Sequence, residues 1–148
     1  MSAEAGATAI PPSGGEALRV LGELVYIKLT GAQTSGLFSL FELVNGPGTG
    51  VPPHVHARED EVFYVVEGRV AFTIDGKALV AEAGASLHLP RGAPHGFQVS
   101  GDGPARIVAM VFPAGIEQMF RELAVLPPGP PDLARVAEIC GRHGITLL

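Results

Sequence analysis

The sequence contains a single cysteine, no cluster of basic residues and no long apolar run. Because Cys140 is alone, no internal disulfide can form, which favours a reducing compartment and predicts a cytoplasmic protein. The net charge is −5, so nucleic acid and anionic membranes are not expected as partners. The longest apolar runs, VFYVV and IVAMVF, are too short to span a bilayer, and the first 17 residues lack the basic start and apolar run of a secretory signal.

Charged side chains are also scarce. They make up 17% of the chain, whereas hydrophobic residues make up 47%. A chain of this length buries roughly 70% of its unfolded surface as one domain, and a partner subunit is expected to cover part of the remaining apolar surface. The sequence therefore predicts one folded domain that assembles as a homodimer, through sheet edges or C-terminal helices.

The chain divides into three regions by pattern. Residues 1–16 are small, interrupted by Gly and Pro and without periodicity, which predicts a flexible N-terminal arm. Residues 17–113 predict an all-β sandwich or barrel. They contain eight short apolar or β-branched runs: LVYIKL, LFSLFELV, EVFYVV, VAFTI, ALVAE, ASLHLP, GFQVS and ARIVAMVF. A tight hairpin is expected at Asp75-Gly76-Lys77, because Asp-Gly tolerates positive φ angles.

Residues 114–148 change to a helical pattern. Apolar residues recur at helical spacing in AGIEQMFRELAVL and again in PPDLARVAEICGRHGITLL. Asp132 stands at the start of the second segment, and Gly141 or Gly144 stands near its end. Two short helices are therefore expected after the barrel, packed on it or on a partner subunit.

Two histidines, His54 and His56, stand one residue apart after a Val-Pro-Pro segment that favours an extended backbone. Exposed loop histidines are one interpretation. In a strand, however, residues i and i+2 point to the same side, so both rings can face a barrel interior. Glu61 and His95 each open a further strand, and Glu59 is a reserve ligand. Three imidazoles and one carboxylate suit one divalent ion of iron, nickel, manganese, cobalt, copper or zinc, and disfavour magnesium and calcium.

These residues belong to two motifs that resemble those of the cupin superfamily. The first motif of that family, a glycine, His-x-His, a glutamate and a second glycine at fixed spacing, is matched by Gly48, His54, His56, Glu61 and Gly68. The second is matched by Gly84, Pro90, Gly92 and His95, with Val99 in place of the family's asparagine. The segment that begins FPAGIEQMFRELA is similar to small single-domain cupins of the quercetin dioxygenase-like type.

The resemblance implies a double-stranded β-helix, which is a small jelly-roll barrel, with a short C-terminal helical extension. It implies that His54, His56, Glu61 and His95 hold one metal ion inside the barrel near one mouth. It further implies a metal-dependent dioxygenase acting on a small aromatic or enolic substrate. In such chemistry the metal lowers the pKa of a phenolic or enolic oxygen, and Glu61 is the candidate general base.

The side chains around the metal are expected to define the small-molecule ligand. Phe63, Phe97 and Met110 are the candidates for an apolar pocket lining, which favours a flat aromatic molecule. No Arg or Lys cluster lies near the motifs, so a sugar phosphate is not favoured. His88 is either a polar pocket residue that orients the substrate or an ordinary half-buried strand histidine.

Two other functions fit the same residues. The protein could hold a metal, or a small ligand through it, without turnover, or it could be a non-oxidative metalloenzyme such as an isomerase or lyase. Several polar groups beyond the metal ligands would favour an enzyme, and a lining of apolar side chains would favour binding. The fold does not choose between these functions.

Overall fold

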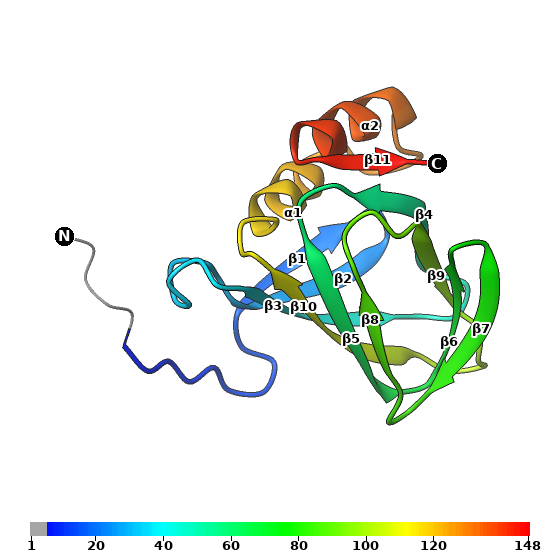
Figure 1. Ribbon diagram of the computed structural model, residues 1–148, viewed down its shortest axis with the longest axis horizontal. Coiled ribbons are helices and arrows are strands. Elements are labelled where there is room, and N and C mark those ends of the chain that lie inside the picture. Colours follow the sequence, from blue (N-terminus) through cyan, green and yellow to red (C-terminus); the bar gives the residue numbers. More distant parts are fainter. Residues whose placement is uncertain (1–5) are drawn as a thin grey trace.

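The computed structural model describes residues 6–148, so residues 1–5 of the predicted N-terminal arm lie outside the described residues. The described chain folds into two antiparallel sheets and two helices (Figure 1). The six-stranded sheet has the order β1 (Glu16–Val20), β2 (Glu23–Leu29), β3 (Ser39–Asn45), β10 (Ala105–Phe112), β5 (Asp60–Glu67) and β8 (Ser86–Leu89). The five-stranded sheet has the order β11 (Ile145–Leu147), β4 (Gly50–His56), β9 (His95–Val99), β6 (Arg69–Ile74) and β7 (Lys77–Glu82).

The core lies between the two sheets and follows from alternation along each strand. In β3, Phe41 and Leu43 are buried, whereas Leu40 is half-buried on the outer face. β10 shows the same alternation, and its register places Ala109 opposite Phe41. Successive strands from β3 to β6 alternate between the two sheets. This is a double-stranded β-helix, so the predicted fold is confirmed, and all eight predicted runs form strands.

The predicted hairpin joins β6 and β7. Asp75 and Gly76 have φ angles of 50° and 77°. Two consecutive positive φ angles match the right-handed twist of the flanking strands, which explains why Asp-Gly occupies this turn.

Two short helices follow the barrel. They are α1 (Glu117–Ala124) and α2 (Leu133–Arg142), as the spacing predicted. The carboxylate of Asp132 caps α2 by accepting hydrogen bonds from the N–H groups of Ala134 and Arg135. Each helix buries apolar side chains in the common core, among them Met119 and Ile139. Neither helix is long and apolar enough to cross a membrane, and no other helix occurs within residues 6–148.

The last residues differ from the helical prediction. α2 ends at Arg142, and Gly144, with φ 77°, reverses the chain. Residues 145–147 then form β11, which lies beside β4 (Figure 1). The register places Ile145 opposite His56. β11 therefore covers the outer edge of the strand that carries two of the predicted metal ligands.

Lys28 ties the described part of the N-terminal arm to the barrel. The ammonium group of Lys28 donates hydrogen bonds to the carbonyl oxygens of Pro11 and Gly14, at 2.9 and 3.0 Å. β1 begins at Glu16, the last residue of the region predicted as the arm.

Candidate metal centre

Three strands bring the four predicted metal ligands together. His54 and His56 lie on β4, Glu61 on β5 and His95 on β9, where the β4–β9 ladder sets His54 opposite His95. All four side chains are buried. Each offers a ligand atom within 4.8 Å of the others. The cluster could hold a metal ion.

The outer nitrogen of each imidazole has a hydrogen-bond acceptor. Nδ1 of His54 donates to the carbonyl of Pro52 at 2.9 Å, and Nδ1 of His95 donates to the carbonyl of Ala93 at 3.0 Å. A carbonyl can only accept, so these Nδ1 atoms carry the proton, and in the neutral ring Nε2 presents a lone pair. All three Nε2 atoms face the centre of the cluster.

Inside the cluster, acceptor atoms face one another without donors. Nε2 of His54 lies 3.1 Å from Nε2 of His56, and Nε2 of His95 lies 2.8 Å from Oε2 of Glu61. The latter two atoms are buried and have no well-directed hydrogen bond. Lone pairs this close repel unless a positive charge lies between them. One proton cannot serve both contacts, whereas one divalent cation can serve all four atoms, so these residues fit a metal ion.

The pKa shifts of the cluster residues follow from burial and from the charges that the residues place beside one another. Burial and the neighbouring histidines lower the pKa of His54 to about 4, which keeps it neutral and able to coordinate. Burial alone would raise the pKa of Glu61, but the histidines around it lower it. Burial alone would lower the pKa of His95, but the Glu61 carboxylate raises it. A metal ion would satisfy the carboxylate and leave the imidazoles neutral.

Glu59 lies behind this cluster and is not part of it. Its Oε2 is 3.3 Å from Nδ1 of His56, on the side of the ring that faces away from the other ligands. A carboxylate in this place orients the imidazole and increases its basicity toward a metal. The neighbouring Asp60 points elsewhere and forms a two-point ion pair with Arg91 at the surface.

We expect Glu59→Ala to weaken metal binding by roughly 10- to 100-fold, because His56 loses the partner of its Nδ1 atom. Glu59→Gln keeps an acceptor oxygen at this position and is expected to retain more of the affinity. Competition titration against a chromophoric chelator measures both. Equal affinities for the wild type and Glu59→Ala would contradict this role.

A cavity of about 310 Å³ adjoins the cluster. His54, His56 and Glu61 form part of its wall, and nearly all the remaining wall is apolar. Phe63 and Phe97 line it, with ring centroids 5.9 Å apart and almost perpendicular planes. The site is therefore a small apolar chamber with its charged groups at the metal cluster.

Met110 and His88 do not line this cavity, so the prediction that they are pocket residues is wrong. On β10 the buried positions are Ile107, Ala109 and Val111, and Met110 is half-buried on the outer face of the sheet. On β8 the buried residue is Leu89, and His88 is exposed. Both residues have the outward parity of their strands.

Glu23 lines the cavity and was missed by sequence reasoning. It is 4% exposed, and burial raises its pKa to about 7, although a hydrogen bond from Asn45 lowers it. The signal was present in the sequence, because Glu23, Val25 and Ile27 share one parity of β2 and the last two are core residues. An acidic side chain at an inward position of an apolar strand loses its contact with water, so a hydrogen-bond partner or a functional role is expected for it.

The pKa of Glu23 predicts a pH-dependent stability. Between its ordinary value of 4.5 and about 7, the folded protein holds a proton that the unfolded chain has released. Stability contributed by this group is therefore complete below pH 4.5 and is lost as the pH rises through 7, by at most about 3 kcal/mol. We expect Glu23→Gln to remove this loss, which urea unfolding of both proteins at pH 5 and pH 8 measures. A difference between them that does not change with pH would contradict it.

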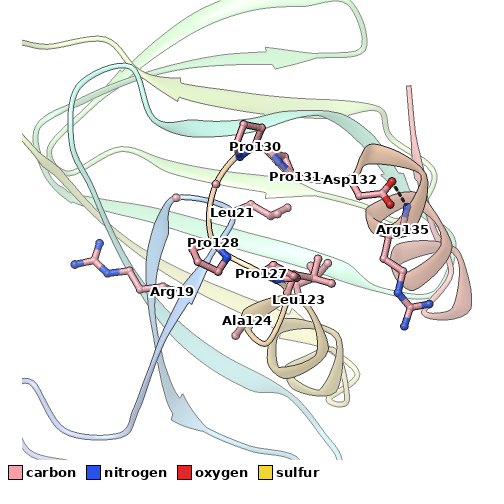
Figure 2. Close-up of a pocket in the computed structure, with 13 residues that line it drawn as sticks. Arg19, Leu21, Leu123, Ala124, Pro127, Pro128, Pro130, Pro131, Asp132 and Arg135 are labelled. Carbon is pink, nitrogen blue, oxygen red and sulfur yellow. Dashed lines mark hydrogen bonds between the residues drawn. The ribbon is translucent and has the colours of Figure 1, made fainter.

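A second hollow, of about 810 Å³, lies between the β1–β2 turn and the proline-rich linker from Leu126 to Asp132 (Figure 2). Asp132 is engaged as the cap of α2, and Figure 2 shows the Arg19 and Arg135 side chains directed apart. Among the described residues this hollow contains no metal-binding cluster. It shares Leu21, Leu123 and Pro131 with the cavity, so the linker forms part of the cavity's outer wall.

Comparison with known proteins identifies the class that this fold and site define. The family model for the cupin domain matches residues 42–112, which include the four clustered residues. The chain belongs to the cupin superfamily.

Its relatives include enzymes and biosynthetic proteins. Quercetin 2,3-dioxygenase of Bacillus subtilis is 26% identical over 98 residues, which cover 66% of this chain and 29% of the dioxygenase. The tetracenomycin polyketide synthase protein TcmJ of Streptomyces glaucescens is 32% identical over 80 residues, which cover 54% of this chain and 52% of TcmJ. The chain thus spans about half the length of these relatives or less.

Among solved structures, KdgF from a Halomonas species superposes with a TM-score of 0.68. The alignment covers 76% of this chain and 99% of KdgF at 17% sequence identity. This likeness concerns the fold alone.

Proposed function

We propose that the protein is a metal-dependent dioxygenase that acts on a small aromatic or enolic substrate. One observation carries the proposal: three inward-facing Nε2 atoms and the Glu61 carboxylate form one cluster, and His54, His56 and Glu61 of this cluster line a small apolar cavity. The similarity to a quercetin dioxygenase and to a polyketide synthase protein supports a phenolic or enolic substrate. His54, His56, Glu61 and His95 are the metal ligands in this proposal.

The chain's own residues have separable tasks. When bound, a divalent transition metal supplies Lewis acidity toward the substrate oxygen. Phe63 and Phe97 pack against a flat substrate and exclude water from the reacting atoms. Glu61 is the carboxylate within the cluster and, when it loosens from the metal, is the candidate general base for the hydroxyl proton of the substrate.

One observation favours a second function, a metal-dependent binding protein without turnover. Beyond the cluster, Glu23 is the only ionisable oxygen group among the described residues of the cavity wall. An isomerase or lyase acting on a sugar would need several more hydrogen-bonding groups than this wall offers. The non-oxidative enzyme is therefore the least favoured of the three.

Metal analysis together with oxygen uptake tests the proposal. The purified protein is loaded separately with iron, nickel, manganese, cobalt, copper or zinc, and oxygen consumption is followed with a flavonol and with simpler enols. We expect about one metal ion per chain and oxygen uptake that requires both the metal and His56. Stoichiometric metal without oxygen uptake would replace the dioxygenase with the binding protein. A His56→Ala variant that still binds the metal tightly would remove the ligand assignment.

We further propose that the protein acts as a homodimer in the cytoplasm. The outer face of the six-stranded sheet supports the dimer because it carries half-buried or exposed apolar side chains: Leu40, Val44, Val62, Tyr64, Val66, Val108 and Met110. A second copy would cover this face. The single cysteine supports the location. Sedimentation equilibrium measures the assembly state directly.

A further inference from the structure

We propose that Glu23 is a specificity residue of the cavity, which binds an oxygen-bearing group of the same ligand that meets the metal cluster. The proposal rests on the proposed function only in taking that ligand to be a flat, largely apolar molecule. It assigns the ligand a second polar group away from the one at the metal.

The position of Glu23 supports this role. It begins β2, whereas the metal cluster comes from β4, β5 and β9. In the six-stranded sheet, β3 and β10 separate β2 from β5, which carries Glu61. Glu23 and the cluster are therefore separate polar points on one apolar wall.

Asn45 leaves one oxygen of Glu23 for the ligand. Nδ2 of Asn45 donates a hydrogen bond to Oε1 of Glu23 at 2.7 Å, and Asn45 is itself 2% exposed. Oε2 of Glu23 takes part in no side-chain hydrogen bond among residues 6–148, whereas Oε1 accepts the one from Asn45. Because Oε1 accepts from Asn45, the proton of the neutral acid belongs on Oε2, which can donate to a ligand oxygen.

The surroundings of Glu23 contain no competing charge. Val20 of β1, Leu21 of the β1–β2 turn and Pro131 of the linker line this part of the cavity wall. The other titratable groups of the wall are those of the metal cluster and Cys140. Below pH 7 the Glu23 carboxyl group, whose pKa is raised to about 7 by burial, is mostly protonated and can donate a hydrogen bond. A ligand oxygen is one acceptor for this proton, and the buried Oδ1 of Asn45, which has no hydrogen-bond partner, is the other.

Two matched flavonols test the proposal on zinc-loaded protein kept free of oxygen, so that no dioxygenation can occur. They are 3-hydroxyflavone and its 4′-hydroxy counterpart, which differ by one hydroxyl on the ring remote from the enol. We expect the wild type to bind the 4′-hydroxy compound roughly three- to tenfold more tightly, as one net hydrogen bond allows. Glu23→Leu should abolish this preference, and Glu23→Gln should keep part of it.

Metal content and unfolding of each variant are measured in parallel, so a lost preference in a folded, metal-loaded Glu23→Leu protein supports the proposal. A preference that survives in Glu23→Leu, equal binding of both flavonols by the wild type, or binding of neither would overturn it. Oxygen uptake is a separate readout. A wild type that shows the Glu23-dependent preference but consumes no oxygen would refute the dioxygenase and leave the role of Glu23 intact.

Discussion

Replacing His95 by alanine is expected to abolish tight metal binding. The ring is 2% exposed, and its Nε2 atom faces Glu61 in the middle of the cluster. Loss of an orienting partner behind a ligand costs roughly 10- to 100-fold in metal affinity, and loss of the ligand itself is expected to cost more. Competition titration with the metal that the wild type retains measures this loss.

Thermal unfolding with and without metal gives a second measure of the same substitution. A metal present at about 1,000 times its Kd stabilises the folded state by about 4 kcal/mol, or roughly 10 °C in Tm for a chain of this length. We expect His95→Ala to lose this metal-dependent increment, whatever happens to its metal-free Tm. His88→Ala is the matched control, because His88 is an exposed histidine on β8. An increment that persists in His95→Ala, or disappears in His88→Ala, would refute the assignment.

Gly50→Ala is expected to cause the largest loss of stability. A Cβ atom at Gly50 would lie 1.9 Å from the carbonyl oxygen of Phe97 and 2.7 Å from Cα of Gln98. Both atoms belong to the backbone of β9, which pairs with β4 at this position, so the two strands must move apart. The same ladder aligns His54 with His95 further along. We expect a loss of about 4 kcal/mol, at the upper end for single substitutions, and weaker metal binding.

Gly46→Ala is the control for this substitution. A Cβ atom at Gly46 meets nothing within 4 Å, and the residue precedes β4 by only a short turn. Its free energy of unfolding, measured with urea, is expected to stay within about 0.5 kcal/mol of the wild type, as for most surface substitutions. Similar losses in the two variants would mean that crowding between β4 and β9 is not the cause.

The part of the site that could be predicted depends on residues that are close to one another in the sequence. His54 and His56 share a strand face because they are two residues apart, and this parity holds in any register. Met110 shows where parity fails. Both faces of β10 are apolar, since Val108 and Met110 on the outer face alternate with buried Ile107, Ala109 and Val111. A strand without polar alternation does not show which face is inward.

Long-range pairing explains what could not be predicted. Residues 145–147 follow a helix and are too few to show a period of their own, so β11 exists only because β4 offers an unpaired edge. His88 could have been placed, because Ser86 and His88 share one face of β8 while Leu87 and Leu89 share the other. Glu23 also carried a readable signal, but the Asn45 partner that stabilises it comes from a different strand.

The pairing of β11 with β4 also sets an order of events in folding. Residue 145 must meet residue 56, whereas the β6–β7 hairpin joins neighbours in the chain. Closing a loop of that length costs more entropy and delays the contact. A nascent chain therefore exposes His54 and His56 to solvent metal long before their strand is held at its outer edge. The strand that carries these two histidines is therefore closed at its outer edge only after the local hairpins have formed.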